Sequence, residues 1–531
     1  MRLPGKASVY REELEEISPA DFFYRNKALA GFDNPVKATY TIIRELVENA
    51  LDACEEARRL PEVSIVLNKV EEKDKSIDID SEVPTELYSL SVRDNGTGLS
   101  AEEIPRAFGQ VLVSSKYKLM QSRGTFGLGG TMALLYGQIT TNMPFEITSS
   151  TGSKIHKITM KIDIQANKPV VLREQTLGVS IEPFTEVKLH FRGNYPRARS
   201  KVIDYLRQTA MITPYANIEF REPDGSLYIF ERNVRELPPL PKESLPHPKG
   251  IDLELLQRML KGTKTRRLVS FLETEFQKVG RKTALEILRR ANLDPALKPK
   301  ELTSEQISAL FRAITNYDRF LPPDPSILSP LGEKLFMAGI KKELKPEFVW
   351  AVKRPPSSVW GHPFLVETAI AYGGDINPTG KVQLYRFANR IPLLYDASSD
   401  VSYLVAKRIN WDVYGIKSLE EEPIALFVHV VSTKIPFKTV GKEFMANEPV
   451  LAKEIELGWR ECGRKLKAYL SGKNRVKRAI SRYIAFKRYY EVIASSLEEL
   501  TGKRPAVDEL LRKLAPTVEE GGEARDESQE A

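Results

Sequence analysis

The sequence of 531 residues is poor in features that mark several classes of protein. Its two cysteines, Cys54 and Cys462, stand far apart, which argues against a disulfide scaffold or a structural zinc site. The five histidines are scattered without metal-ligand spacing. The longest apolar run, 424–431, is interrupted by His429 and is far shorter than the about 20 residues of a membrane span. The charged segment 1–16 lacks the apolar stretch of a secretion signal. We therefore expect a cytoplasmic protein that is not attached to a membrane.

The charge of the chain is unevenly distributed. Lys and Arg number 79 against 71 Asp and Glu, a formal net charge of +8. The last thirteen residues, 519–531, hold six acidic residues and one basic residue, so the remainder carries 78 basic against 65 acidic residues. This excess of positive charge in residues 1–518 favours a polyanionic partner, with nucleic acid as the first candidate and a membrane surface as the second. The acidic tail is expected to be disordered.

Hydrophobic periodicity divides the chain into four parts. The first part is predicted to hold a helix over 35–60 and strands over 63–70, 87–93, 145–149, 155–164 and 186–191. Many of these strands alternate apolar and polar residues, as in a half-buried antiparallel sheet with helices on one face. Five prolines make 237–250 a linker. A basic helical insert follows over 251–321, and strand patterns return at 348–352, 364–371, 382–387 and 424–431 before a long helix at 449–490. The expected domains are 1–236, 237–330, 331–500 and 501–531.

The first motif that carries chemistry lies in the predicted helix over 35–60. Glu45 and Asn49 are four residues apart, so both side chains lie on one helix face. A carboxylate there can orient and deprotonate a water molecule, while an amide oxygen one turn along can ligate Mg²⁺. Taken alone, such a pair is more often part of a solvated helix face.

The second motif follows a predicted strand and contains Asp94, Gly96 and Gly98. Its glycines permit a tight turn against which a planar ligand can lie. Asp94 can accept a hydrogen bond from an exocyclic amine. Taken alone, an ordinary Asn-Gly turn explains this segment better.

The third motif is a glycine-rich loop, 124–131, that opens an apolar helix. Such a loop presents backbone N–H groups and the positive end of the helix dipole to phosphates. The loop lacks the Gly-Lys-Ser/Thr ending of a P-loop, and no acidic residue follows at the distance typical of the dinucleotide fingerprint.

Together, the three motifs resemble the superfamily of gyrase, the large heat-shock chaperone, sensor histidine kinases and the mismatch-repair ATPase. Residues 45–52 match its E-x-x-x-N-x-x-D box, 94–98 its D-x-G-x-G box and 124–129 its second glycine box. Thr185 matches its final Gly-Thr element, with Phe184 in place of the glycine. The resemblance implies an α+β Bergerat-type sandwich that binds ATP and Mg²⁺, with residues 99–123 as a lid. It assigns nucleotide binding to Asn49 (also the Mg²⁺ ligand), Asp94, Gly96, Gly98, Ser115, Lys116, Gly124, Thr125, Phe126, Gly127, Leu128, Gly129, Gly130, Thr131 and Thr185.

The resemblance also bears on hydrolysis. Glu45 is present and no phosphoacceptor histidine block is found, which favours the hydrolysing branch with Glu45 as the catalytic base. That branch needs a lysine from a second domain at the γ-phosphate. The loop 432–443 between a strand and the long helix is the expected place. Lys442 is the first choice, as both catalytic and nucleotide-binding residue, and Lys434 is the second; two solvent-exposed lysines are the alternative.

The basic insert narrows the resemblance. Residues 276–295 look like a helix–two-turn–helix module in which Gly280 serves the turn and Lys278, Arg281 and Lys282 bind a DNA phosphate; a basic helical spacer is the alternative. An ATPase, this module, a strand-rich transducer and a long helix together resemble the B subunits of the type IIB DNA topoisomerases.

This second resemblance implies partners. A separate A subunit would cut double-stranded DNA, two copies of this chain would dimerise through residues 1–20 on ATP binding, and an A2B2 heterotetramer associated with the nucleoid would result. The helix over 460–488 either packs on its own domain or forms a stalk for the partner subunit. The rival hypotheses are a mismatch-repair-like or chaperone-like ATPase and a DNA-binding scaffold with a degenerate ATP pocket.

Overall fold

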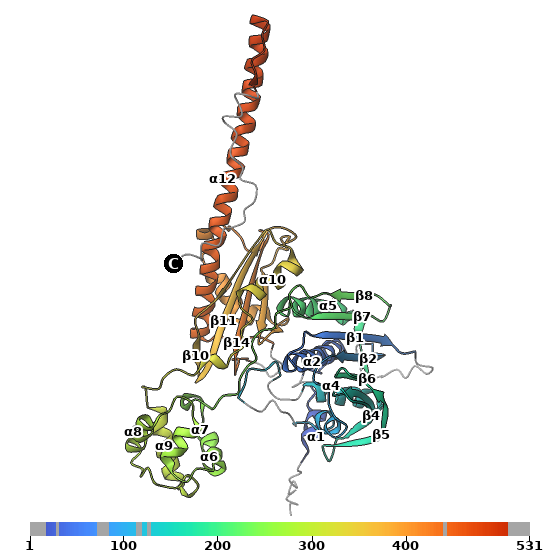
Figure 1. The fold of residues 1–531 in the computed structure, drawn as a ribbon, viewed down its shortest axis with the longest axis vertical. Helices are drawn as coiled ribbons and strands as arrows, with labels where there is room; N and C mark the ends of the chain where they lie inside the picture. The colour runs from blue at the N-terminus through green and yellow to red at the C-terminus, as the bar shows by residue number, and fades with distance from the viewer. Residues whose placement is uncertain are drawn as a thin grey trace, which may run out of the picture.

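The computed structural model describes residues 17–27, 31–71, 84–112, 119–124, 129–438 and 443–507. Two β-sheets, a helical insert beside them and one long helix that projects away from the second sheet make up this part of the chain (Figure 1). None of the described helices is long and apolar enough to cross a membrane. The expectations for residues 1–16 and for the acidic tail lie outside the described residues.

The first sheet has eight strands in the order β5-β4-β3-β6-β2-β1-β7-β8, and every neighbouring pair is antiparallel except the parallel pair β1 and β7. The strands are β1 (Glu62–Lys69), β2 (Glu86–Asp94), β3 (Phe145–Ser150), β4 (Lys154–Asp163), β5 (Lys168–Val179), β6 (Phe184–Gly193), β7 (Asn217–Arg221) and β8 (Leu227–Phe230).

Helices cover one face of this sheet (Figure 1). They are α1 (Pro19–Arg25), α2 (Pro35–Glu56), α3 (Glu103–Phe108), α4 (Gly129–Thr141) and α5 (Tyr195–Ile212). The helix α2 begins where the Asn34 side chain accepts a hydrogen bond from the Lys37 N–H at 2.8 Å, with Pro35 in the first turn, a favourable start for a helix. Its apolar stripe enters one continuous core with α4, α5 and the sheet. The expected α+β class is confirmed.

The insert has an apolar core of its own. Its elements are η3 (Pro248–Gly250), α6 (Leu253–Gly262), α7 (Leu268–Glu275), α8 (Arg281–Arg290), η4 (Pro299–Glu301), α9 (Ser304–Thr315) and η5 (Pro325–Ile327). In the turn between α7 and α8, the left-handed residue is Lys278, with φ 58°, whereas Gly280 has φ −92°. Gly280 lies at the end of this turn, directly before α8, in a backbone conformation that is open to any residue.

The second sheet runs β10-β11-β14-β12-β13, with β9 also paired to β11. Its elements and the flanking helices are α10 (Glu333–Leu344), β9 (Phe348–Lys353), β10 (Ser357–Val359), β11 (His362–Tyr372), β12 (Gln383–Ala388), β13 (Ile391–Pro392), η6 (Ala397–Ser399), α11 (Val401–Arg408), η7 (Trp411–Tyr414), β14 (Ile424–Ser432) and α12 (Pro449–Thr501). Every residue of β14 is buried, because alternate side chains enter two apolar clusters on opposite faces. Burial on both faces explains the longest apolar run in the sequence.

The long helix α12 packs only its first part on the second sheet. Its buried residues lie between Leu451 and Leu466, apart from Ala494, and Trp459 donates to the Phe427 carbonyl at 2.9 Å. Tyr469 still stacks on Phe348 of β9, and Lys473 pairs with Glu347. Beyond Lys473 the helix stands clear of the sheet (Figure 1), and it ends before Gly502, whose φ of 67° suits a helix C-terminus. It continues past the predicted end at residue 490.

Six elements of the first part were not predicted from the sequence: α1, α3, β5, α5, β7 and β8. Strand β5 is mostly exposed along its length, so its apolar residues do not alternate with polar ones. The helix α5 has several polar residues among its buried positions, including Gln208 and Thr209, and this weakens the apolar periodicity that identifies a helix.

Candidate active site

The three sequence motifs meet along one stripe of the helix α2. A side-chain carbon at Gly129, the first residue of α4, would overlap the Glu45 carboxylate, and one at Gly130 would overlap the Asn49 amide. One turn further along α2, a carbon at Gly96 would lie 2.7 Å from the Ala53 side chain. The absence of side chains at these glycines therefore lets α2 meet both the start of α4 and the turn after β2. From Glu45 to Ala53 the stripe measures about 12 Å.

Glu45 and Asn49 both reach the N-terminal end of α4. The first N–H groups of a helix lack partners within the helix and attract negative charge. A carboxylate and an amide beside such an end form a surface that suits a phosphate, an attacking water molecule and a phosphate-bound cation. Thr131, in the first turn of α4, is buried at the same end.

Arg44 was not singled out from the sequence, yet it contacts the Glu45 carboxylate. Its Nε also lies 3.5 Å from Glu48 Oε1, one turn along the helix. A neighbouring positive charge favours the ionised form of a carboxylate. The sequence could have indicated this contact, because Arg44 stands directly before Glu45 in the motif.

Asp94 ends β2 in a buried position, with 7% of its surface exposed. Burial, opposed by hydrogen bonds from the Gly96 and Thr185 backbone, raises the pKa of Asp94 to about 7. The Gly96 N–H donates to Asp94 Oδ1 at 2.8 Å. Gly98 has φ 68°, and a side chain there would overlap the Ser150 carbonyl, so the turn requires glycine. A buried acceptor of this kind suits an exocyclic amine.

Thr185 lies opposite Asp94 in the antiparallel pair of β2 and β6. Its Oγ1 is 3.0 Å from Ser149 Oγ, which in turn accepts a hydrogen bond from the Leu99 N–H at 2.9 Å. Ser149 was missed because a serine within a strand carries no sequence signal. The Arg93 guanidinium lies 3.9 Å above the ring of Phe184, the residue that stands where glycine was expected.

Several residues predicted for the site lie outside the described residues. They are Ser115, Lys116, Thr125, Phe126, Gly127, Leu128 and Lys442. The neighbour of Lys442 is placed: Glu443 Oε1 lies 2.7 Å from Lys37 Nζ in the first turn of α2. The second-choice lysine, Lys434, is exposed and lies near enough to His362 to help burial lower the pKa of that imidazole to about 4.

The proposed lid, residues 99–123, is anchored at its far end. Gln121 and Arg123 are 2% and 3% exposed, and Arg123 Nη1 lies 2.7 Å from Asp52 Oδ1, the last residue of the first motif. The Gln121 amide pairs with the Ser329 backbone at 2.7 and 3.1 Å. The far end of the expected lid therefore packs against α2 and against the segment that follows the helical insert.

The candidate DNA-binding residues lie at one end of α8. Lys278 stands in the turn before the helix, with its Nζ 3.6 Å from Asp324 Oδ2. Arg281 and Lys282 occupy the exposed first turn, and Gly280 has open space around it. All three positions lie at the N-terminal end of α8, and α8 itself lies away from α2 (Figure 1).

The fold and this site define an ATPase of the histidine kinase, gyrase B and heat-shock chaperone class. Residues 35–165 match the family described as Histidine kinase-, DNA gyrase B-, and HSP90-like ATPase. Residues 323–482 match the family described as Topoisomerase VI B subunit, transducer.

Curated relatives extend over nearly the whole chain. The B subunit of type 2 DNA topoisomerase 6 from Metallosphaera sedula is 40% identical over 514 residues, which cover 96% of this chain and 93% of the relative. The protein of the same name from Pyrobaculum aerophilum is 40% identical over 508 residues, covering 95% and 93%. The chain belongs to the family of type 2 DNA topoisomerase 6 B subunits. This assignment decides against the mismatch-repair-like and chaperone-like alternatives.

A solved structure of the 43K ATPase domain of Thermus thermophilus gyrase B superposes with a TM-score of 0.39 at 13% identity, covering 86% of this chain and 97% of that chain. At that score the superposition adds nothing to the family assignment.

Proposed function

We propose that this chain is the ATP-hydrolysing clamp of a type IIB DNA topoisomerase, and that it coordinates the passage of one double-stranded DNA through another. ATP lies along the α2 stripe, with its phosphates at the start of α4 and its adenine at Asp94. The observation that carries this proposal is the placement of Glu45, Asn49 and the Gly96 turn on one stripe of α2 in a member of this family.

Each residue of the site has a distinct role in the proposal. Glu45 accepts a proton from the water molecule that attacks the γ-phosphorus, and the bond between that phosphorus and the ADP oxygen breaks. Asp94 accepts a hydrogen bond from the adenine amine, supported by Thr185. The glycine loop, residues 124–130, presents N–H groups to the phosphates.

The residues at the start of α4 fit a phosphate-bound Mg²⁺. No group of three or more His, Cys, Asp or Glu side chains suited to a metal occurs among the described residues, so the site offers few protein ligands. Mg²⁺ commonly keeps several waters and binds substrate phosphates with one or two protein oxygens. Asn49 supplies such an oxygen. The ion would neutralise charge that develops on the phosphates.

Lys442 contacts the γ-phosphate in this proposal and reports hydrolysis to the second sheet. The ion pair between Lys37 and Glu443 supports this choice, because it holds the end of the 432–443 loop against α2. Lys434 has no comparable link to α2 among the described contacts.

The remaining roles are assigned to separate parts of the chain. Residues 1–236 bind ATP and dimerise through their N-terminal segment, 237–330 contact DNA through Lys278, Arg281 and Lys282, and 331–500 relay hydrolysis. The exposed half of α12 carries apolar side chains such as Ile484 and Tyr489, which suit docking of a separate A subunit that cuts DNA. The assembly is an A2B2 heterotetramer in the cytoplasm, associated with the nucleoid.

ATP turnover with and without duplex DNA tests the proposal, with Glu45→Ala beside the wild type. General-base catalysis contributes about 10²- to 10⁴-fold, so the variant should lose at least about a hundredfold in kcat while it still binds ATP. The exposed Glu56, at the end of the same helix, is the control as Glu56→Ala. Hydrolysis by Glu45→Ala at the wild-type rate would refute the assignment.

A further inference from the structure

Arg390 occupies an unusual backbone position in the second sheet. Strands β12 and β13 pair through Ala388 and Ile391, so Asn389 and Arg390 form the two-residue turn between them. Their φ angles are 47° and 66°. Asn-Gly is the preferred sequence for such a turn, because glycine adopts the second left-handed position at little cost. An arginine at this position therefore indicates that contacts of its side chain offset the cost of the left-handed backbone.

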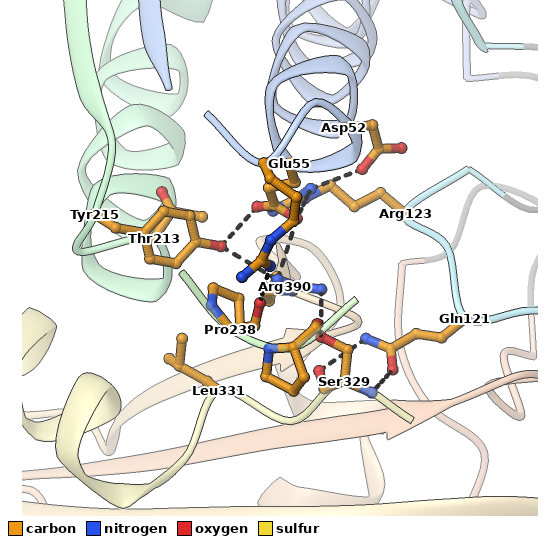
Figure 2. A network of polar contacts seen from close by, with 12 residues as sticks. Asp52, Glu55, Gln121, Arg123, Thr213, Tyr215, Pro238, Ser329, Leu331 and Arg390 are labelled. Atoms are coloured by element: carbon orange, nitrogen blue, oxygen red, sulfur yellow. Dashed lines mark hydrogen bonds and ion pairs between the residues drawn. The ribbon is translucent and has the colours of Figure 1, made fainter. Parts of the chain in front are cut away.

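The Arg390 guanidinium reaches out of its own sheet (Figure 2). Its Nη1 lies 3.1 Å from Glu55 Oε2, at the end of α2, and donates to Tyr215 Oη at 3.2 Å. Its Nη2 donates to Ser329 Oγ at 3.1 Å. Arg390 is only 6% exposed. One side chain of the second sheet thus joins α2 to the segment that leaves the helical insert.

Glu55 is shared between two arginines (Figure 2). Arg123 Nη1 donates to Glu55 Oε2 at 3.0 Å and also to Asp52 at 2.7 Å. Although burial opposes ionisation, Arg123 and Arg390 hold the pKa of Glu55 below its usual range. Two arginines and two carboxylates make this cluster neutral. Separating one member would leave a buried charge unpaired, so such a cluster favours discrete arrangements over gradual ones.

The cluster holds the segment 119–124, which leads directly into the glycine loop. Asn389 donates to the Ser122 carbonyl at 3.1 Å, beside the contact of Arg123 with Glu55. Ser122 Oγ donates in turn to the Gly124 carbonyl at 2.7 Å. A cavity of about 220 Å³, bordered by 120–123 and by 237–241, lies next to the segment.

We propose that Arg390 is a positioning residue that couples α2 to the second sheet, by holding Glu55, and through Glu55 also Arg123 of segment 119–124, at the β12–β13 turn. The inference rests on the proposed nucleotide site. When ATP binds along the α2 stripe, a shift of α2 or of segment 119–124 passes through the buried cluster to β12 and to its neighbour β14. Arg390 thereby makes DNA passage depend on ATP, without touching ATP.

The test uses the full chain with its A subunit and the variant Arg390→Gly. Glycine keeps the left-handed turn and removes the whole side chain, including the guanidinium. Arg390→Lys retains one positive charge and is the conservative variant. Arg199→Ala is the control for loss of an arginine, because Arg199, whose side chain is 46% exposed, pairs with the buried Glu222 at 2.7 Å beside Tyr195, within the first part of the chain.

Two measurements are compared for each variant: kcat and KM for ATP without DNA, and the number of supercoils removed per ATP hydrolysed. Arg390→Gly should keep both kinetic constants within about twofold while supercoils removed per ATP fall about tenfold, within the range of measured coupling effects. Arg390→Lys should recover part of this ratio, and Arg199→Ala should leave it unchanged. An unchanged ratio in Arg390→Gly overturns the proposal.

Hydrogen exchange of residues 119–124 in the nucleotide-free protein separates this proposal from the ATPase assignment. Arg390→Gly should exchange these amides faster, whereas Arg199→Ala and Glu45→Ala should not. Unchanged exchange in Arg390→Gly overturns the coupling, even if the Glu45 test succeeds. If Arg390→Gly does not fold, Asn389→Gly removes the contact to Ser122 in the same turn. Faster exchange of residues 119–124 and fewer supercoils removed per ATP in Asn389→Gly would then support the proposal, and no change in either would overturn it.

Discussion

Lys37 and Glu443 form a 2.7 Å ion pair between the first turn of α2 and the chain just before α12. The pair joins the helix that carries Glu45 to the chain that leads into the projecting helix. Lys37 is only partly exposed, and its contact with Glu443, together with Asp33, raises its pKa although burial opposes the shift. This contact places the residue directly after Lys442 against the first turn of α2, about 12 Å along the helix from Glu45.

Replacement of Lys442 by alanine should lower kcat for ATP about tenfold or more, because a positive charge at the transferring phosphoryl group stabilises the transition state. Lys434→Ala is the matched control, since it removes the same charge from an exposed position in the same loop. Steady-state ATP turnover measures both. A large loss for Lys434→Ala and none for Lys442→Ala would reverse the assignment.

Gly129→Ala should lower ATP turnover about a hundredfold, because the added carbon overlaps the Glu45 carboxylate and a displacement of about 1 Å can cost that much. Binding of ATP should weaken less. Gly472→Ala is the control: Gly472 lies in α12 with open space around it, so alanine there should stabilise the helix by about 0.5–1 kcal/mol. Turnover and thermal unfolding of both variants check this pair. Normal turnover in Gly129→Ala would show that Glu45 does not act at the start of α4.

The affinity for ATP should fall as the pH drops below 7. Burial raises the pKa of Asp94 to about 7, so the nucleotide-free protein holds a proton on this carboxyl at lower pH. An ionised carboxylate accepts the hydrogen bond of the adenine amine more strongly than a protonated carboxyl does, so binding favours release of that proton. Affinity should therefore weaken by up to about tenfold per pH unit below 7 and level off above it.

Calorimetric titration with ATP between pH 5.5 and 8.5 checks this slope. Asp94→Asn keeps an acceptor oxygen but does not titrate, so the ratio of the two affinities removes the titration of the phosphates themselves. A ratio that does not change with pH would exclude Asp94 from the adenine contact.

Removal of three charges by Lys278→Ala, Arg281→Ala and Lys282→Ala should weaken duplex DNA binding and flatten its salt dependence. Removing one phosphate contact lowers the slope of log K against log salt by about 0.9. A control triple on α6 and the segment after it, Arg258→Ala, Lys261→Ala and Lys264→Ala, removes equal charge from the same insert. Fluorescence anisotropy at several salt concentrations measures both triples. Equal salt-dependence slopes for the two triple variants would show that Lys278, Arg281 and Lys282 contribute only general electrostatic attraction to DNA.

Much of the fold was predictable because local patterns agree with the tertiary structure. The helix α2 and strand β14 have strong apolar periodicity or continuous burial, and both were located within a few residues. Strand β5 and helix α5 were missed, because an exposed edge strand and a helix with buried polar residues lack such periodicity.

Part of the site was also visible in the sequence. Glu45 and Asn49 could be placed on one helix face from their spacing alone. The contribution of Ser149 to the Thr185 contact could not be predicted, because it depends on which strands lie side by side. The Arg390 contact with Glu55 joins residues 335 positions apart in sequence, and no local pattern reports such a pair.

The sequence alone determined the chemistry available to this protein: a carboxylate and an amide at helical spacing, an acidic turn with glycines, a glycine loop, and a basic insert. Local spacing is enough for these, because helix and turn geometry follow from neighbouring residues. The tertiary structure alone decided which groups meet. It brought the start of α4 to Glu45, Glu443 to Lys37 and Arg390 to Glu55. These contacts follow from the packing of α2 on the first sheet and α4, and of α5 on β13 and α10, which buries apolar surface contributed by distant parts of the chain.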